Sequence, residues 1–395
     1  MKRREFIKTG LSGLAAIAIG SVSIPKLFRF EAFAAQRSID LSMDAALVEM
    51  VDGSRVFHWL FGSPASGPSF PGPVIFASAG DAITLNLTNR LKETHALRIV
   101  GTSIVSPDIP PGQTRSLSFT APAAGTYLYC DPLPVNRVLG LHGALVVSPV
   151  SGSTPYSLPT PAVRLLFEDL KHSDHFPSNR KSAPGWQPDR FRIWLQHQID
   201  PALNARAQAA YLDGRAFTLS AAELTARFLP RYFTINGKSG AFSAHDPSVA
   251  LDGLIGEPML VRLLNSGLFT HSNHLHANHY YVLAVNNVVQ ENVINLDSQI
   301  LKPLDRVDWL VPFLRPPDIA GDKSIPLRTL IANELGLKIS GPNGSPGFPQ
   351  SPLVYPMHCH MEQSQTAAGG NYPQGSVAHF NFLGDLDGIE FPNTM

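Results

Sequence analysis

Short stretches of alternating apolar and polar residues recur along the chain, separated by turns rich in Gly and Pro. Residues 80–91, GDAITLNLTNRL, alternate in this way and predict a half-buried strand. Residues 110–130 predict a turn, a strand, a second turn at Gly125 and an aromatic strand, and GLHGALVVSP at 140–149 closes the unit. We therefore expect a β-sandwich over residues 39–150.

A second unit of the same design extends over residues 231–385. GEPMLVRLLNSG at 256–267 matches the first alternating strand in type, and ILKPLDRVDWLVPF at 300–313 matches the turn followed by a strand. YPMHCHME, from residue 355, takes the place of the aromatic strand. The pattern predicts an all-β protein built from two Greek-key sandwiches.

The segment 151–230 has fewer strand signals, and we interpret it as a decorated, partly helical linker. PAVRLLFEDL at 161–170 is a candidate strand, and residues 178–190 form a candidate loop. Ser220 and Glu223 have capping-box spacing, so a short helix is expected to begin there.

The N-terminus predicts export. Basic residues with the pair Arg3-Arg4 precede a short apolar run, and Ala32-Phe33-Ala34 resembles a cleavage site. This pattern is typical of a twin-arginine signal over residues 1–35, which implies a periplasmic or otherwise exported protein. A plain secretory peptide or a retained anchor are the alternatives, although the short, Gly-interrupted run argues against an anchor.

The composition argues against nucleic-acid binding and against binding to anionic membranes. The 31 acidic and 31 basic residues cancel, so no basic excess favours nucleic acid or anionic lipid. No later stretch is long and apolar enough to span a membrane. The chain has two cysteines, Cys130 and Cys359, which in an exported protein either form a disulfide or leave a thiolate available to a metal.

Two histidine motifs carry the candidate chemistry. His271, His274 and His276 form HxxHxH, and His358-Cys359-His360 forms HCH. Because side chains alternate along a strand, His358 and His360 would face one way and Cys359 the other. His274 and His276 likewise share a face, so the two pairs could bind one ion, while His271 at the strand entry could turn elsewhere.

The motifs "HSNHLH…HCHME", with "GPVIFASAGDAITLNLTN", "GTYLY…GLHGALVV" and "RYFTINGK", resemble the multicopper oxidase family over most of the chain outside 151–230. The resemblance implies two cupredoxin-like domains and bound copper. It implies that Cys359 and His271 belong to a type 1 copper site. It further implies that a trinuclear cluster uses His274, His276, His358 and His360, and soft thiolate and imidazole donors suit copper.

The family pattern fails in three places. Ser364 stands where a further histidine is expected, and Gly369 stands where a weak axial Met or Leu is expected. The first unit lacks the other cluster histidines, having Arg98 and Val100 at one motif and residues 130–132, Cys-Asp-Pro, at the other. A guanidinium cannot ligate copper, so the resemblance implies an incomplete cluster.

The first unit also resembles copper nitrite reductases, with His95 near a type 1 histidine and Cys130 within one position of the type 1 cysteine. Their remaining type 1 ligands fall near Asn136 and Leu141, with His142 one position along. Met361, expected on the same strand face as Cys359, is either a substitute soft ligand or a core residue.

Two functions follow from these residues. One is a copper-dependent oxidoreductase acting on a small-molecule or metal-ion substrate. The other is a non-enzymatic cupredoxin that binds copper or serves as a periplasmic interaction or structural protein. Two-domain members of the family are often trimers, so a homotrimer is one alternative, while the sequence itself leaves the oligomeric state open.

Overall fold

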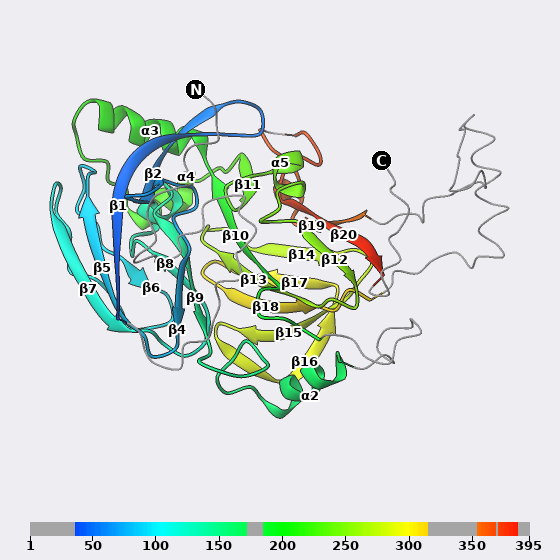
Figure 1. The fold of residues 1–395 in the computed structure, drawn as a ribbon. Helices are drawn as coiled ribbons and strands as arrows, with labels where there is room; N and C mark the ends of the chain where they lie inside the picture. The colour runs from blue at the N-terminus through cyan, green and yellow to red at the C-terminus, as the bar shows by residue number, and fades with distance from the viewer. Residues whose placement is uncertain (1–35, 172–184, 315–353, 369, 386–395) are drawn as a thin grey trace, which may run out of the picture.

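The computed structural model describes residues 36–171, 185–314, 354–368 and 370–385. The predicted twin-arginine signal at 1–35 and the axial position Gly369 lie outside these residues. In Figure 1 the first half of the chain (blue to cyan) forms one group of strands and the second half (green to red) forms another. The predicted all-β architecture of two sandwiches is confirmed.

The first half contains two sheets. One has the strand order β3-β2-β1-β5-β7 and the other β4-β9-β8-β6. The strands are β1 (Gln36–Glu49), β2 (Arg55–Ser63), β3 (Gly67–Pro68), β4 (Ile75–Ser78), β5 (Ala82–Asn89), β6 (Arg98–Ile99), β7 (Thr114–Thr120), β8 (Gly125–Cys130) and β9 (His142–Ser148).

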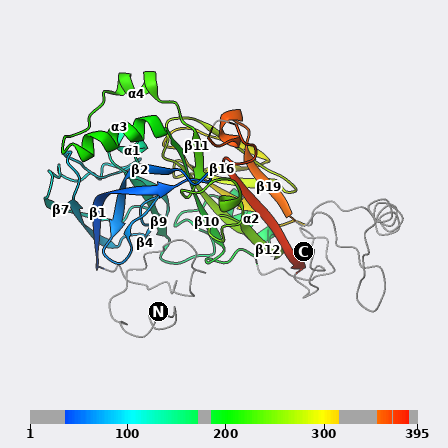
Figure 2. The same ribbon diagram turned by 90° about the horizontal axis from the view of Figure 1, so that it is seen from above.

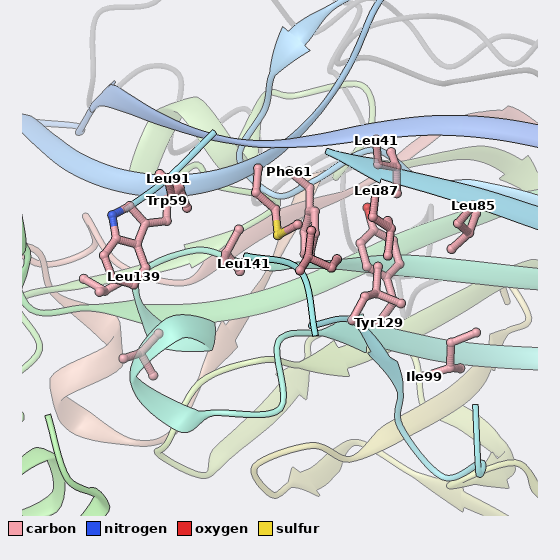
Figure 3. Packing of buried hydrophobic residues seen from close by; sticks show 14 of the residues in the cluster. Leu41, Trp59, Phe61, Leu85, Leu87, Leu91, Ile99, Tyr129, Leu139 and Leu141 are labelled. Carbon is pink, nitrogen blue, oxygen red and sulfur yellow. The ribbon is translucent and has the colours of Figure 1, made fainter. Parts of the chain in front are cut away.

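Alternation along the strands builds the core of this half. In β5, Ile83, Leu85 and Leu87 are buried while the residues between them are less so, as the pattern predicts. They pack in one cluster with Trp59 from β2 and Tyr129 from β8. Figure 3 shows part of this core, with Leu85, Leu87 and Tyr129 close together. Burial of such large apolar side chains contributes about 1.5–3 kcal/mol each.

The second half also contains two sheets, ordered β11-β10-β13-β18-β15-β16 and β12-β20-β19-β14-β17. Its core includes Trp194 and Trp309, and Trp309 stacks on Tyr280 with ring centroids 3.8 Å apart. The strands are β10 (Phe191–Ile199), β11 (Tyr232–Ile235), β12 (Leu251–Ile255), β13 (Met259–Asn265), β14 (His271–Leu275), β15 (Tyr280–Val285), β16 (Val288–Leu296), β17 (Ser298–Leu301), β18 (Arg306–Val311), β19 (Val354–Cys359) and β20 (Val377–Asp385).

The strand predicted at 161–170 is wrong, because this segment forms helix α2 (Pro161–Asp169). Thr160 caps the helix and Pro161 occupies its first turn, which suits a proline without an N–H to donate. Val163, Leu166 and Phe167 follow helical spacing and pack in one apolar cluster with residues of β16 (Figure 1).

The remaining helices are short and lie at the margins of the sheets. Helix α3 packs on β2, and Figure 2 shows α3 and α4 together over the first half. The predicted capping box is confirmed, since Ser220 and Glu223 bond reciprocally at the start of α4. These helices are α1 (Pro134–Val138), α3 (Pro201–Leu212), α4 (Ala221–Arg227), α5 (Gly240–Ala244) and the 3-10 helix η3 (Glu362–Gln365).

Strand β10 lies within the segment predicted to be a linker, yet it pairs with both β13 and β11 in the six-stranded sheet. It is buried along most of its length and lacks the alternation of a half-exposed strand. Its polar residues Gln196, His197 and Gln198 are all buried, and two of them contact the strand that carries HxxHxH.

A buried polar network joins the two halves. Arg262 of β13 donates to the Thr126 hydroxyl at 2.8 Å, and Thr126 donates to Asp308 of β18 at 2.6 Å. Arg262 and Asp308 form an ion pair at 3.5 Å with side chains 4% and 3% exposed. Among the described residues, no helix combines the length and apolar character needed to cross a bilayer.

Candidate metal centre

The two histidine motifs lie on neighbouring strands, β14 and β19, in the upper part of the second half in Figure 1. Their antiparallel register places His274 opposite His358 and Asn273 opposite Cys359. The backbone N–H of His276 donates to the Pro356 carbonyl. Directly opposed side chains on one sheet face lie close together, so this register brings the motifs to one place.

Four imidazoles converge on this face. Ligating atoms of His274, His358 and His360 all lie within 4.8 Å of one another. The Nε2 atoms of His276 and His358 are 3.1 Å apart, and the rings of His274 and His276 have centroids separated by 4.7 Å. The predicted meeting of the two pairs is therefore present, and the four side chains are named here the four-histidine cluster.

The surroundings of the cluster leave imidazole lone pairs available to a metal. His274 Nδ1 donates to the Asp297 carbonyl and the Ser298 hydroxyl, each at 3.0 Å, which leaves Nε2 as the free acceptor. Burial, followed by the neighbouring imidazoles, lowers the pKa of His276 and of His358. Neutral imidazole nitrogens held by hydrogen bonds of this kind suit copper, so the cluster fits the metal.

His271 and Cys359 occupy the opposite, buried face. Both are fully buried, and His271 Nδ1 lies 3.4 Å from Cys359 Sγ. The predicted alternation within HCH is thus observed, with His360 exposed and Cys359 inside. Both cysteines are free, so the disulfide alternative is not the one in the structure. Burial raises the pKa of the Cys359 thiol and lowers that of His271 to about 4.

The other expected partners of Cys359 do not supply a metal ligand. Ser364 is buried, and its hydroxyl donates to the Met361 carbonyl at 2.7 Å. The Met361 side chain is 41% exposed, so the expectation that it shares a strand face with Cys359 is wrong. The reason is that β19 ends at Cys359, and Met361 caps the 3-10 helix that follows.

In the first half, His95 does not pair with Cys130. His95 Nδ1 lies 2.9 Å from Asp131 Oδ2 and 3.2 Å from Asn136 Nδ2. Burial alone would lower the pKa of His95, but Asp131 and Glu93 outweigh it and raise that pKa. Cys130 directly precedes Asp131 in the chain, but its side chain packs in an apolar cluster with Val100, Leu128 and Ala144, away from His95. A shift of one position in a strand moves a side chain to the other face, which separates the predicted pair.

The positions where the family pattern expects first-half cluster histidines hold other groups. Val100 is 9% exposed and packs with Cys130 in an apolar cluster. Arg98 pairs with Cys130 across strands β6 and β8. Within the described residues, the only three His, Cys, Asp or Glu donors within mutual ligating range are those of His274, His358 and His360.

Sequence reasoning missed the residues that orient the histidines. Ser298 and the Asp297 carbonyl fix the tautomer of His274, and Gln198 lies 2.5 Å from His271. The polar run Gln196-His197-Gln198 inside an apolar stretch was the available signal, because buried polar groups require partners.

Comparison with known proteins shows which families this chain is similar to. A family model described as multicopper oxidase matches residues 65–152. L-ascorbate oxidase of Cucumis sativus is 35% identical over 153 residues, covering 35% of this chain and 25% of that protein. Copper-containing nitrite reductase of Neisseria meningitidis is 27% identical over 151 residues, 36% of each chain. These matches support the resemblance of this chain to the multicopper oxidase family.

The fold agrees with this family. A blue copper oxidase from Nitrosomonas europaea superposes with a TM-score of 0.59 and 17% identity, covering 88% of this chain and 86% of that one. The two sandwiches are therefore cupredoxin-like. The sequence match spans about a quarter of the length of the ascorbate oxidase, so a multicopper oxidase activity does not transfer to this chain on similarity alone.

Proposed function

We propose that this protein is an exported, copper-dependent oxidoreductase whose copper is held by the four-histidine cluster. The observation that carries the proposal is the convergence of His274, His358 and His360, with ligating atoms within 4.8 Å of one another. These histidines come from β14 and β19, two strands that are far apart in the sequence but are paired in the sheet. A site of this geometry gives an ion three nitrogen donors from a rigid platform.

Each residue has a defined part in the proposed site. Copper, when bound, supplies one-electron redox chemistry. His274 presents Nε2 because its Nδ1 proton is committed to Asp297 and Ser298. His276 lies beside His358 and offers a fourth nitrogen, either to the same ion or to a second one. His360 is the most exposed of the four and borders the solvent face.

The proposed site is smaller than a complete trinuclear cluster. Arg98 and Val100 stand at the expected first-half ligand positions, and neither side chain can ligate copper. Any oligomer would repeat the same deficit in every subunit. We therefore propose one or two copper ions per chain, with oxidase activity reduced relative to the complete family pattern.

The named relatives suggest which substrates to test. Ascorbate and nitrite are the compounds in the names of the matched oxidases and reductases, so they are the first probes for this chain. Export by the twin-arginine pathway is part of the proposal and rests on Arg3-Arg4. Replacing both with Lys should keep the protein in the cytoplasm.

A non-enzymatic copper-binding protein is the second candidate. The absence of histidines at the expected first-half ligand positions favours it. The buried His95 also favours it, because its Nδ1 is held in a hydrogen bond to Asp131. The two candidates share copper binding and differ in turnover.

The deciding experiment measures copper per chain and substrate-dependent oxygen or nitrite consumption after reconstitution. We expect at least one copper in the wild type and a loss of most of it in His274→Ala/His358→Ala. His279→Ala, which alters an exposed histidine of the loop after β14, is the matched control and should retain copper. Copper without turnover would favour the binding protein, and unchanged copper in the double variant would refute the proposed site.

A further inference from the structure

The buried pair His271 and Cys359 has too few donors for a copper site. The two atoms that face each other, Nδ1 and Sγ, are 3.4 Å apart. Among the described residues no third His, Cys, Asp or Glu donor joins them within mutual ligating range. Ser364, at the position of the expected second histidine, commits its hydroxyl proton to a backbone carbonyl.

Gln198 fixes where the proton of His271 lies. The Gln198 carboxamide oxygen accepts hydrogen bonds from the backbone N–H groups of Leu268 and Phe269 at 2.8 and 3.0 Å. The amide NH2 must therefore point the other way, and it lies 2.5 Å from His271 Nε2. A neutral imidazole that accepts at Nε2 carries its proton on Nδ1, directed at Cys359 Sγ.

A metal at Nδ1 would need the opposite tautomer. The proton would move to Nε2 and meet the NH2 of Gln198, so two donors would face each other at 2.5 Å. Turning the amide over would lose both backbone hydrogen bonds and leave two buried N–H groups facing a donor, and buried donors without acceptors are costly. The surroundings of His271 thus oppose ligation.

Neighbouring residues hold Gln198 in this orientation. Its NH2 also lies 3.4 Å from Asn265 Oδ1, which itself accepts from the Gly267 N–H. A Cβ at Gly267 would come within 1.8 Å of the Gln198 oxygen, so only glycine leaves room for the carboxamide. The fully buried Gln198 is a built part of this face of the sheet rather than a surface contact.

We infer that His271 and Cys359 form a metal-free imidazole–thiol pair, with Gln198 as the positioning residue that keeps Nδ1 protonated. The pair lies on the buried face of β14 and β19, whose other face carries the four-histidine cluster. No electron then passes through Cys359. A reductant has to meet metal at the four-histidine cluster itself, where His360 is exposed and the other three rings are partly exposed.

This inference about His271 is independent of copper binding, and its first test needs no metal. Nitrogen-15 spectra of histidine-labelled protein, with His271→Gln identifying the signal, should show the proton of His271 on Nδ1. In Gln198→Glu the carboxylate can accept from the Leu268 and Phe269 N–H groups and also from His271, so the proton of His271 should move to Nε2. A wild-type His271 protonated on Nε2 would overturn the inference whether or not that variant folds.

The second test uses copper as the probe. Copper-loaded wild type should lack the intense thiolate–copper absorption near ~600 nm that type 1 sites show. Cys359→Ser should bind as many copper ions per chain as the wild type. A strong band in the wild type that disappears in Cys359→Ser would refute the inference. Loss of copper in the His274→Ala/His358→Ala variant, by contrast, bears only on the proposed function.

Discussion

Buried histidines should make this protein sensitive to acid, and His142 gives the sharpest case. Its ring is fully buried, lies 4.3 Å from the ring of His197, and has no partner for Nε2. Burial lowers its pKa from 6.5 to about 3, while the hydrogen bond to the Arg137 carbonyl acts the other way and nearby Arg137 and His58 lower it further. The folded protein therefore keeps this imidazole neutral at pH 5.

Proton linkage gives the direction and the size of the effect of pH on the free energy of unfolding. The unfolded chain protonates His142 below pH 6.5 and the folded chain does not, so stability is fully present above that pH and falls with acidification. Between pH 7 and pH 5 the loss from this one residue is about 2 kcal/mol. His58, whose pKa burial lowers to about 4, adds a loss of similar size.

The perturbation is His142→Phe, which keeps a ring and removes the titrating group. Urea unfolding of copper-free protein at pH 7 and pH 5, followed by fluorescence of the buried tryptophans, gives the free energy at each pH. The variant should lose about 1 kcal/mol at pH 7, for the missing hydrogen bond to Arg137, yet show a pH-dependent loss about 2 kcal/mol smaller than wild type. His279→Gln, at an exposed site, should leave the difference unchanged. An identical pH-dependent loss in His142→Phe and wild type would refute the reasoning.

Other substitutions test separate contacts. Asp308→Asn leaves a buried guanidinium without its charge partner and should lower the unfolding free energy by about 3 kcal/mol, measured by urea unfolding; an unchanged value would show that the ion pair does not stabilise the fold. Gly267→Ala should cost about 1–3 kcal/mol in the same assay, since its methyl group would displace Gln198, and full stability would mean that the carboxamide has room elsewhere. Ser298→Ala removes one acceptor of the His274 Nδ1 proton and should weaken copper binding about 10-fold by competitive chelator titration, whereas equal affinity would show that the Asp297 carbonyl suffices.

The sequence predicts those parts of the fold that depend on local periodicity. The alternation in β5 and the two-residue spacing within HxH and HCH show which side chains share one face of a strand. Both features could therefore be predicted without tertiary information. The convergence of the two motifs also needed the pairing of β14 with β19, which the family resemblance implied.

The parts that were missed depend on contacts distant in sequence. The strand prediction at 161–170 is wrong because the apolar residues there satisfy both the strand and the helix period over a short stretch. Packing against β16 selects helix α2. Strand β10 is buried on both faces and has no alternation to detect. The role of Gln198 depends on Leu268 and Phe269, 70 and 71 residues away.

Copper-edge X-ray absorption of the reconstituted protein tests the central claim most directly. Copper held by the four-histidine cluster should show a first shell of nitrogen from three or four imidazoles, with no sulfur scatterer. The His274→Ala/His358→Ala variant should lose that signal. A short copper–sulfur contribution, or a wild-type spectrum that the double variant reproduces, would contradict the account.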